Sequence, residues 1–514
     1  MTWTLLNQRN DEASKIRWEL VPYFCGRILD IGCGGYKAFP HFIGVDNGKM
    51  WGKQWSDVSE DAAKLDMWVS GSCDGVFSSH LLEHIDYSMI PLVLSEWCRV
   101  VKDGGHIMLY VPDEAQYPKV GTEYANPDHK WDVNYDKIIA AMETLQRGWD
   151  LVDYQVRSEN DEYSLFFVFK LSKGRERKYS YRDPKPTKTC AVVRYGAFGD
   201  LIQTSSILPG LKEQGYHITL YCSHRGYPVI KHDPHIDRFI IQESDAVPPQ
   251  FLGEFWGYTR RKYDKWVNLS ESVEGSLLTM PGRVNYYWPD EMKAKHLDCN
   301  YIEFTHEIAG VPPPYRPKFY STPEERVWAK ERARYYGGRN ILWSLAGSAV
   351  HKVWPHLDAV VARMLLTYPE VHIVMVGDEA CQIIEQPWTK EKRIHCHSGR
   401  WTIRESMAFA EVADLIIGTE TGLLNAAGSM DTPKIVTLSH SSENMLTKHW
   451  KNTIALSQPN GTCKRQPCRT LHQEWSSCMK HEATGTAMCQ FEITADMMWD
   501  AVQRVLGEAQ RKVA

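Results

Sequence analysis

Two glycine-rich turns, each directly after an apolar run, constrain the fold of this chain more than any other feature. The first reads RILDIGCGG over residues 27–35, and the second reads AVVRYGAFGD over residues 191–200. A strand that ends in such a turn and continues into a helix directs backbone N–H groups toward a ligand. The sequence therefore predicts two α/β units, each with a turn that can hold a charged or nucleotide-like ligand.

Length and composition set the outer limits of the interpretation. A chain of 514 residues is too long for one hydrophobic core, and its size favours about three domain-sized units. Lys and Arg total 59 against 64 Asp and Glu, so no overall basic field favours nucleic acid. The N-terminal residues lack the apolar core of a signal peptide, and no apolar run is long enough to span a bilayer. We expect a cytoplasmic protein.

Short apolar runs alternate with helical patterns along most of the chain, which is typical of parallel α/β sheets. We expect a first domain over residues 1–174 and a basic, proline-containing linker over residues 175–188. Two further α/β domains are expected over residues 189–320 and 321–514. Apolar spacing near the end predicts a terminal helix over residues 493–513.

The first glycine turn is followed by acidic residues suited to a nucleoside. Asp30 ends the first apolar run, and Gly32 and Gly34 permit a tight turn with close approach to a ligand. Asp46 ends the next apolar run, where a carboxylate can accept both hydroxyls of a ribose. Asp61, further on, can accept from an adenine amino group.

Together with the segment SSHLLEH over residues 78–84, these residues resemble the class I S-adenosylmethionine-dependent methyltransferases, over residues 27–171. The resemblance implies a Rossmann-like domain with S-adenosylmethionine as its cofactor. In this interpretation the glycines line the methionine part, Asp46 binds the ribose, Asp61 binds the adenine and Ser79 lies beside the transferred methyl group. The residues expected to bind the cofactor are Asp30, Gly32, Gly34, Asp46, Asp61 and Ser79.

Other interpretations of this first region are weighed against its sequence features. A dinucleotide-binding fingerprint fits less well, because Lys37 stands where its third glycine would be. Too few residues separate Gly35 from the next apolar run for the usual crossover helix, so we expect a more open pocket. His84 and His129 are interpreted as structural, and no base for methyl transfer is assigned. A Rossmann scaffold without this activity is the alternative.

The second glycine turn leads to Asp200. A carboxylate after Gly196 and Gly199 would face the cleft and can deprotonate a sugar hydroxyl as a general base. Asp is equally a good N-cap residue, and a helix is expected to begin near Leu201. The turn by itself leaves both interpretations open.

Two later segments can bind a diphosphate. SLAGSAVHKVWP offers Ser344, Ser348 and Lys352 after an apolar run, a set of hydroxyl and ammonium groups suited to phosphate oxygens. Thr421 and Gly422 open an expected helix, whose N–H groups can bind an anion.

These ordered segments resemble the family 9 glycosyltransferases, the lipopolysaccharide heptosyltransferase family, over residues 189–514. The resemblance implies a GT-B fold of two Rossmann-like halves, with the acceptor in the first half and the nucleotide sugar in the second. Asp200 corresponds to the proposed base of an inverting transfer, and no metal is required. The residues expected to bind the nucleotide sugar are Ser344, Ser348, Lys352, Glu379, Thr421, Gly422 and Leu423.

Departures from the family pattern concern the donor and the acceptor. The family's Asp and His stand here as Glu420 and Asn425, and Asn425 cannot carry the positive charge of a His. We therefore expect a donor related to ADP-heptose without assigning that sugar. Glu271, Glu274 and Arg283 can grip a polar acceptor or belong to a solvated loop.

Four cysteines cluster near the end of the chain, at Cys463, Cys468, Cys478 and Cys489. Their spacing lacks the close pairs of a typical zinc site. Reduced structural thiols, a zinc site that includes His472 or His481, and disulfides are three open interpretations.

The sequence thus predicts a bifunctional enzyme that transfers a sugar from a nucleotide diphosphate and a methyl group from S-adenosylmethionine. The expected acceptor is a glycan or glycolipid such as lipopolysaccharide, with peripheral association with a membrane surface as an option and no nucleic acid. One alternative is a glycosyltransferase of a phage or mobile element that modifies nucleic acid or protein. The other is a non-catalytic structural or binding protein whose enzyme folds have decayed.

Overall fold

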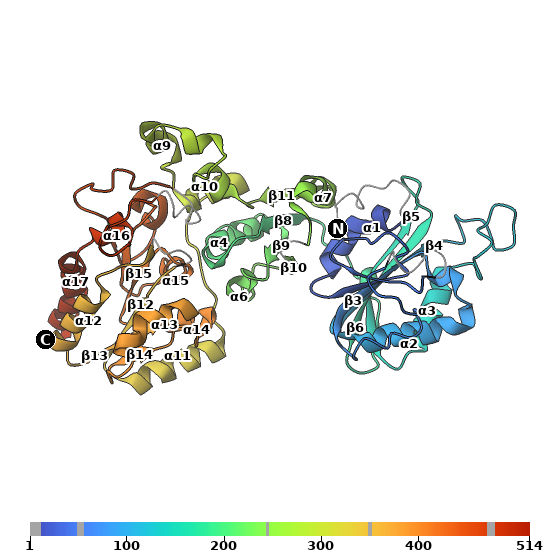
Figure 1. Cartoon of the computed structure of the whole chain (residues 1–514), viewed down its shortest axis with the longest axis horizontal. Coiled ribbons are helices and arrows are strands. Elements are labelled where there is room, and N and C mark those ends of the chain that lie inside the picture. Colours follow the sequence, from blue (N-terminus) through green and yellow to red (C-terminus); the bar gives the residue numbers. More distant parts are fainter. Residues whose placement is uncertain (1–11, 49–55, 243–245, 348–351, 470–477, 514) are drawn as a thin grey trace. The chain divides into compact units, whose positions relative to one another are not determined.

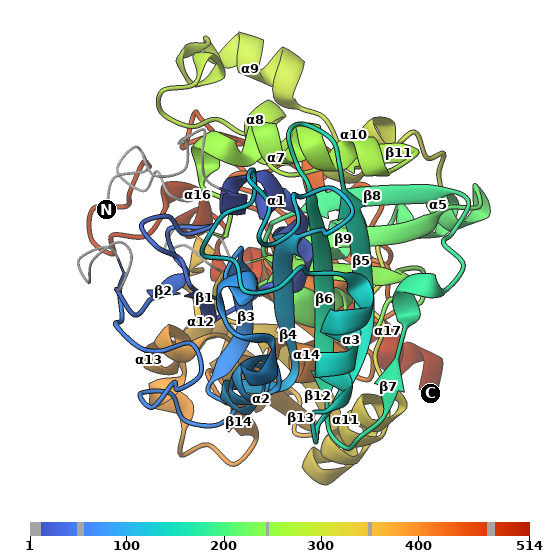
Figure 2. The same cartoon turned by 90° about the vertical axis from the view of Figure 1, so that its right-hand side faces the viewer.

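Seven strands form the first sheet, in the order β2-β1-β3-β4-β6-β5-β7, and Figure 2 shows the larger strands side by side. The computed structural model describes residues 12–48, 56–242, 246–347, 352–469 and 478–513. Strands β2, β1, β3 and β4 are parallel, so their carboxyl ends meet at one edge. The strands are β1 (Ile28–Ile31), β2 (Ile43–Val45), β3 (Cys73–Ser79), β4 (Val101–Pro112), β5 (Gly148–Arg157), β6 (Ser164–Ser172) and β7 (Arg177–Lys178).

Helices α2 (Ile90–Val100) and α3 (Tyr135–Glu143) pack on this sheet and close its main core. Apolar residues recur every three or four positions along α2, which places them on one face of the helix. That face is fully buried against the sheet, through Ile90, Val93, Leu94 and Trp97. Helix α1 (Glu12–Leu20) precedes the first strand.

The connection between β1 and β2 contains no helix among its described residues, which confirms the short connection expected from the sequence. A loop replaces it, and the rings of Phe24, Phe39 and Phe42 pack together around it, with centroids 4.9–5.3 Å apart. Lys37 braces this loop, because its ammonium donates to the carbonyls of Pro40 and Phe42 at 3.0 and 2.8 Å.

The segment expected to be a linker contributes to the first sheet. Its residues form β7, which pairs with β5, and a turn over Ser180–Arg182. The hydroxyl groups of Tyr181 and Tyr135 lie 3.0 Å apart, so the turn is attached to α3. Residues 177–182 therefore pack on the first sheet and do not form a free connection.

Two further sheets follow, and they confirm the α/β class predicted from the sequence (Figure 1). The second has the order β10-β9-β8-β11 and the third has the order β14-β13-β12-β15-β16-β17. Every pair in the third sheet is parallel. The strands are β8 (Thr189–Arg194), β9 (His217–Ser223), β10 (Arg238–Gln242), β11 (Lys265–Asn268), β12 (Arg339–Ser344), β13 (Val371–Val376), β14 (Ile394–Cys396), β15 (Leu415–Thr419), β16 (Lys434–Thr437) and β17 (Thr453–Leu456).

The chain divides into two compact units. Unit 1 comprises residues 1–187 and 240–262, and unit 2 comprises residues 188–239 and 263–514. Unit 1 thus includes α7 (Leu252–Thr259), whose Phe255 ring lies 5.8 Å from that of Trp18 in α1. None of the described helices combines the length and the apolar character that crossing a membrane requires.

Helices between the strands of unit 2 complete its architecture. Helix α17 packs with α12 in the core of the third sheet, which places the expected terminal helix. The helices are α4 (Phe198–Thr204), α5 (Leu208–Glu213), α6 (Tyr227–Ile230), α8 (Ser272–Ser276), α9 (Asp290–Leu297), α10 (Tyr301–Ala309), α11 (Pro323–Tyr336), α12 (Leu357–Thr367), α13 (Gln382–Glu385), α14 (Ile403–Ala410), α15 (Gly422–Ala427), α16 (Met488–Phe491) and α17 (Ala495–Val513).

Candidate functional sites

The first glycine turn is fastened to the end of the neighbouring strand β2. Gly32 and Gly34 have φ of +74° and +54°, in the left-handed region that favours glycine. Asp46 follows β2, and its carboxylate accepts from the N–H groups of Gly34 at 3.1 Å and Gly48 at 2.8 Å. The structure therefore brings together the two features that the sequence assigned to the methionine part and the ribose of a cofactor.

Asp30 and Asp61 are placed differently. Asp30 is buried at the end of β1 and accepts from the N–H of Ala38 at 2.8 Å, so it shapes the loop behind the turn. Asp61 lies on an exposed turn, where its carboxylate accepts from the N–H of Ala63 at 2.9 Å. Asp61 is open to a ligand, whereas Asp30 contacts the protein interior.

Ser79 ends β3, at the same sheet edge as the glycine turn. Its hydroxyl oxygen is buried and has no hydrogen-bond partner among the described residues. Leu81, two residues on, packs against the turn so closely that a Cβ on Gly32 would lie 2.7 Å from its side chain. The glycine turn, the end of β2 and the end of β3 therefore lie around a common site. The Ser79 hydroxyl without a hydrogen bond and the tight glycine turn are consistent with cofactor binding at this site.

A buried carboxylate lies just beyond this edge. Glu83 is completely buried, and His80 Nδ1 lies 3.4 Å from its Oε1. Burial works against the charged form of Glu83, but His80 outweighs it and holds the pKa of Glu83 below its usual value. Burial lowers the pKa of the neighbouring His129, whose Nε2 is 3.9 Å from Glu83 Oε1.

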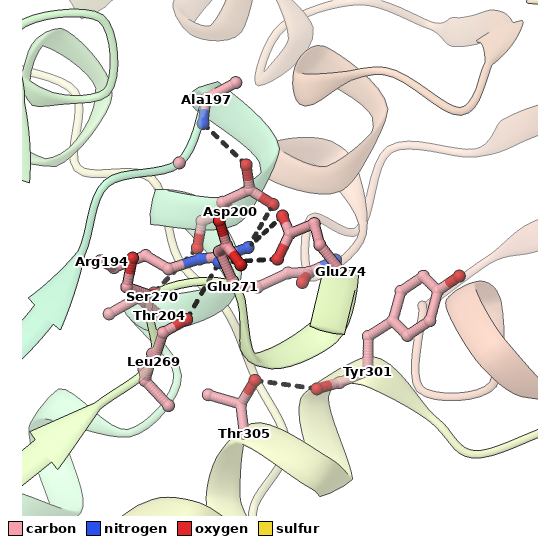
Figure 3. A network of polar contacts seen from close by, with 12 residues as sticks. Arg194, Ala197, Asp200, Thr204, Leu269, Ser270, Glu271, Glu274, Tyr301 and Thr305 are labelled. Atoms are coloured by element: carbon pink, nitrogen blue, oxygen red, sulfur yellow. Dashed lines mark hydrogen bonds and ion pairs between the residues drawn. The ribbon is translucent and has the colours of Figure 1, made fainter. Parts of the chain in front are cut away.

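In unit 2, Asp200 is fixed by a buried arginine (Figure 3). Its Oδ1 accepts from Arg194 at 2.7 Å and its Oδ2 accepts from the N–H of Ala197 at 2.7 Å. The Asp200 side chain is 27% exposed and that of Arg194 only 4%. A carboxylate offers about four acceptor positions, so Asp200 is oriented and still has room for a proton from a ligand.

Arg194 connects Asp200 to a second carboxylate. Its two terminal nitrogens each donate to Glu274 at 2.9 Å, and one also donates to the carbonyl of Leu269 at 2.9 Å. Burial disfavours the guanidinium charge, but Asp200 and Glu274 outweigh it and raise the pKa of Arg194. The sequence analysis gave no role to Arg194, although an arginine that ends an apolar strand was a signal for it.

The structure gives Asp200 a capping role, but not as the N-cap residue itself. Ala197 is the N-cap of α4, and Asp200 lies at the third helical position with its carboxylate folded back to the N-cap N–H. Gly196 makes this fold possible, because a Cβ there would lie 2.3 Å from the Asp200 side chain. Capping and a chemical role are compatible, since only one carboxylate oxygen is used by the cap.

The turn before α4 contacts the turn before α15. A Cβ on Gly422 would lie 2.7 Å from the Phe198 Cβ, so glycine permits the close approach. Gln203 of α4 donates to Asn425 of α15 at 3.2 Å, and Asn425 in turn donates to the Thr421 carbonyl at 2.9 Å. Asn425, which stands where the family has His, thus joins the two halves of unit 2.

Lys352 lies beside the second of these turns. Its ammonium is buried, with 8% of the residue exposed, and donates to the Glu420 carbonyl at 3.0 Å. Burial lowers the pKa of Lys352, and the nearby charges of Glu420 and Asp200 oppose this effect. The Ser344 and Thr421 hydroxyl oxygens lie 3.4 Å apart at the same strand ends. Three residues expected at the diphosphate therefore lie together, next to the turn that precedes Asp200.

Glu420 faces the protein interior. Its carboxylate accepts from the N–H groups of Ser439 and Ser441 at 2.8 and 3.1 Å and lies 2.7 Å from His440 Nδ1. Burial alone would raise the pKa of Glu420, but His440, Lys352 and the hydrogen bonds outweigh it and hold that pKa far below its usual value. Glu420 thus shapes the loop after β16 beneath Lys352.

The remaining residues expected near the nucleotide sugar are dispersed. Leu423 is buried inside α15, and its side chain packs in the interior. Glu379 is exposed after β13, against Gly399. Ser348 lies outside the described residues. In the acceptor region, Arg283 donates to the exposed Glu271 at 2.8 Å, whereas Glu274 belongs to the network of Arg194.

The fold brings the late cysteines together. Cys463 and Cys489 are buried in one small cluster with Cys478 packed against it. Burial, followed by Cys468 and Cys463, raises the pKa of Cys478 to about 11. All thirteen cysteines lie in the described part of the chain, and none forms a disulfide. His472, one of the expected zinc ligands, lies outside the described residues.

Comparisons with known proteins identify a domain in unit 1. A family model described as a methyltransferase domain matches residues 29–109. This match confirms the first resemblance, and the chain contains a methyltransferase domain. No curated protein matches the chain in sequence.

Solved structures are similar to both parts of the chain. Escherichia coli ADP-heptose LPS heptosyltransferase II is 14% identical, covers 63% of this chain and 99% of its own, and gives a TM-score of 0.46. A family 9 glycosyl transferase from Veillonella parvula is 15% identical over 62% of this chain and 98% of its own, with a TM-score of 0.46. An S-adenosylmethionine-dependent methyltransferase from Archaeoglobus fulgidus is 20% identical over 33% and 100%, with a TM-score of 0.25.

Proposed function

We propose that the protein carries two transferase sites, one in each unit. Unit 1 transfers a methyl group from S-adenosylmethionine, and unit 2 transfers a sugar from a nucleotide diphosphate to a glycan hydroxyl by inverting chemistry. The observation that carries the second activity is the close approach of the turn that precedes Asp200 to the turn of Thr421 and Gly422, beside the buried Lys352. The sequence places these segments far apart.

The geometry supports a division of labour in unit 2. Asp200 would take the proton of the acceptor hydroxyl while that oxygen bonds to the anomeric carbon. The bond from the same carbon to the diphosphate breaks, and the buried ammonium of Lys352 stabilises the departing charge. Arg194 acts as a positioning residue, since its ion pair fixes the Asp200 carboxylate.

In unit 1, Gly32, Gly34, Asp46 and Ser79 would hold S-adenosylmethionine, which supplies an electrophilic methyl group. The N–H groups of the turn bind its polar part, and Asp46 accepts from the ribose hydroxyls. Asp61 is proposed to contact the adenine from its exposed turn. Asp30 would support the glycine turn indirectly, through its hydrogen bond to the loop that follows the turn.

The acceptor that fits both activities is a bacterial surface glycan such as lipopolysaccharide, modified at the cytoplasmic face of the membrane. Two transferases in one chain are expected to act on the same glycan. The donor is a nucleotide diphosphate sugar related to ADP-heptose. Because Asn425 offers no positive charge, we propose that the donor need not be that sugar.

The test of the glycosyltransferase site uses two variants that each remove one carboxylate from Arg194. We expect Asp200→Asn to lower transfer from a panel of ADP-, GDP- and UDP-sugars to purified lipopolysaccharide by about 10²- to 10⁴-fold, because the base is lost. Glu274→Gln loses the same kind of ion pair without losing the base, so its transfer should stay within several-fold of wild type. Calorimetry with ADP, GDP and UDP should show the same nucleotide affinity in all three proteins.

Full transfer by Asp200→Asn would remove Asp200 from the role of base. If the wild-type protein bound none of these nucleotides, the glycosyltransferase assignment would be wrong.

The methyltransferase site is tested by binding. We expect Asp46→Asn to weaken S-adenosylmethionine binding by about 10- to 100-fold in calorimetry, the effect of losing a hydrogen bond to a charged group. Asp66→Asn is the matched control, because that carboxylate lies exposed in the same unit. Equal affinity of the two variants would contradict the assigned role of Asp46.

A further inference from the structure

Three side chains that the proposed activities do not use converge beside the end of β3. They are Glu83 and His84, in a short 3₁₀ turn over Leu82–His84, and His129, from the loop between β4 and α3. One ligand atom from each lies within 4.8 Å of the other two. Both histidines were interpreted as structural from the sequence, because their separation along the chain gives no sign that they meet.

The backbone holds the two segments together without help from these side chains. The N–H of Lys130 donates to the Glu83 carbonyl at 2.7 Å. The indole of Trp131 donates to the carbonyls of Leu82 and Ile85, each at 3.0 Å. The three side chains are therefore brought together by a built framework, and their convergence does not depend on contacts among themselves.

Glu83 has unused binding capacity. It is fully buried, and neither of its carboxylate oxygens has a hydrogen bond among the described residues. His84 Nδ1 is also buried without a hydrogen bond there. His80 and His129 approach Glu83 only at 3.4 and 3.9 Å. At these distances the histidines offset the carboxylate charge without hydrogen bonds, and a bound cation would compensate it more fully.

We propose that Glu83, His84 and His129 bind one divalent transition-metal ion. Protein nitrogen and oxygen ligands lie about 2.0–2.2 Å from such ions, so two ligands of one ion are at most about 4.4 Å apart. The observed spread exceeds this limit by a few tenths of an ångström, which side-chain rotation can close. Imidazole and carboxylate together suit Zn²⁺, Mn²⁺, Co²⁺ or Fe²⁺ better than Mg²⁺ or Ca²⁺.

The position of the ion suggests what it does. Three protein ligands leave open positions for oxygen ligands. Leu81 of the same segment packs on Gly32 of the cofactor turn, and Ser78 donates to the Ile31 carbonyl at 2.9 Å. A small pocket lined by Glu114, Tyr117, His129 and Trp131 adjoins the site. An acceptor hydroxyl bound to the ion would lie near the methyl donor, a role that rests on the proposed methyl transfer, whereas the metal site does not.

The experiment measures Mn²⁺ binding to the full-length protein after chelator treatment, by electron paramagnetic resonance of the unbound ion. Mn²⁺ is chosen because thiolates compete poorly for it, which sets the late cysteines aside. We expect about one Mn²⁺ per chain in the wild type. Glu83→Gln and His129→Gln should each weaken binding by at least 10-fold. Glu114→Gln, which removes a carboxylate from the adjoining pocket, should bind like wild type.

Thermal unfolding with and without Mn²⁺ gives a second measurement of metal binding in case one variant folds poorly. Added Mn²⁺ should raise the unfolding temperature of the wild type and of Glu114→Gln, but not that of Glu83→Gln or His129→Gln. Failure of the wild type to bind Mn²⁺, Co²⁺ or Zn²⁺ would overturn the proposal, and so would unchanged Mn²⁺ binding in both ligand variants. A separate measurement of S-adenosylmethionine binding tests the methyltransferase assignment independently of the metal site.

Discussion

Single residues show where chemistry and local structure demand the same side chain. Asp200 caps the backbone of α4 with one oxygen and pairs with Arg194 through the other, so one carboxylate serves both contacts. The sequence predicted Asp200 and its two alternative roles from one short motif. It could not predict that Arg194 fixes this carboxylate while also pairing with Glu274, because Glu274 lies 80 residues after Arg194.

Gly196 is expected to be indispensable for the orientation of Asp200. An alanine Cβ there would lie 2.3 Å from the Asp200 side chain and displace it. We expect Gly196→Ala to lower stability by about 1–3 kcal/mol, as overpacking does, and to reduce glycosyl transfer. Gly253→Ala, where an added Cβ meets open space, is the control for denaturant unfolding. Wild-type stability and transfer in Gly196→Ala would contradict this account of the turn.

Glu420 is expected to contribute strongly to the stability of unit 2. Its buried carboxylate accepts from two backbone N–H groups and pairs with His440, so a neutral side chain leaves these partners uncompensated. We expect Glu420→Gln to lower the free energy of unfolding by about 3–5 kcal/mol in urea. The exposed Glu443→Gln serves as the control and should change it by less than about 0.5 kcal/mol. Equal stability of both variants would show that the network contributes little.

At the scale of elements, most strands with several apolar residues were predictable, including the short edge strand β2, but two edge strands of the third sheet were not. The apolar runs at β1, β2, β8 and β12 each predicted a strand. The sequence analysis missed β14 and β17, which lie at the two edges of the third sheet. β14 has three residues, of which only Ile394 is buried. Such a strand is defined by its neighbour β13, and its own sequence carries too little periodicity to show it.

The packing of β14 against α11 is expected to make unit 2 sensitive to acid. His395 stacks on Tyr336 with ring centroids 3.8 Å apart, and His397 Nε2 lies 2.6 Å from the Tyr336 hydroxyl. Burial, followed by a neighbouring histidine, lowers the pKa of His395 and of His397 to about 4. The unfolded chain has ordinary histidine pKa values near 6.5, so between pH 6.5 and 4 it binds more protons than the folded protein.

Stability contributed by these neutral histidines is therefore complete above about pH 6.5 and is lost as the pH falls toward 4. We expect a loss of about 1–3 kcal/mol over this range from the pair, seen in urea unfolding at several pH values. His395→Asn/His397→Asn should flatten this part of the profile, whereas His296→Asn on α9 should not. An unchanged slope in the double variant would contradict the assignment.

At the scale of the whole molecule, the two compact units predict independent responses to ligands. Each unit has its own sheets and core, so we expect two thermal transitions. S-adenosylhomocysteine at about 100 times its Kd should stabilise unit 1 by about 2.7 kcal/mol and raise only one transition. A bound nucleoside diphosphate should raise only the other. Calorimetric scanning of wild type and Asp46→Asn checks this, since in the variant only the shift caused by S-adenosylhomocysteine should become smaller.

One ligand that raised both transitions equally would contradict independence of the units.

The sequence by itself determined the α/β class, the strands that carry the motifs and the methyltransferase domain. These depend on local signals: apolar runs, glycine turns and acidic residues at strand ends, which act within a few residues of one another. Only the tertiary structure decided which distant groups meet. It brought the turn before Asp200 to the turn of Thr421, turned Glu420 inward and gathered Glu83, His84 and His129. Parallel strands bring segments remote in the chain to one sheet edge, and no pattern within a single segment encodes that meeting.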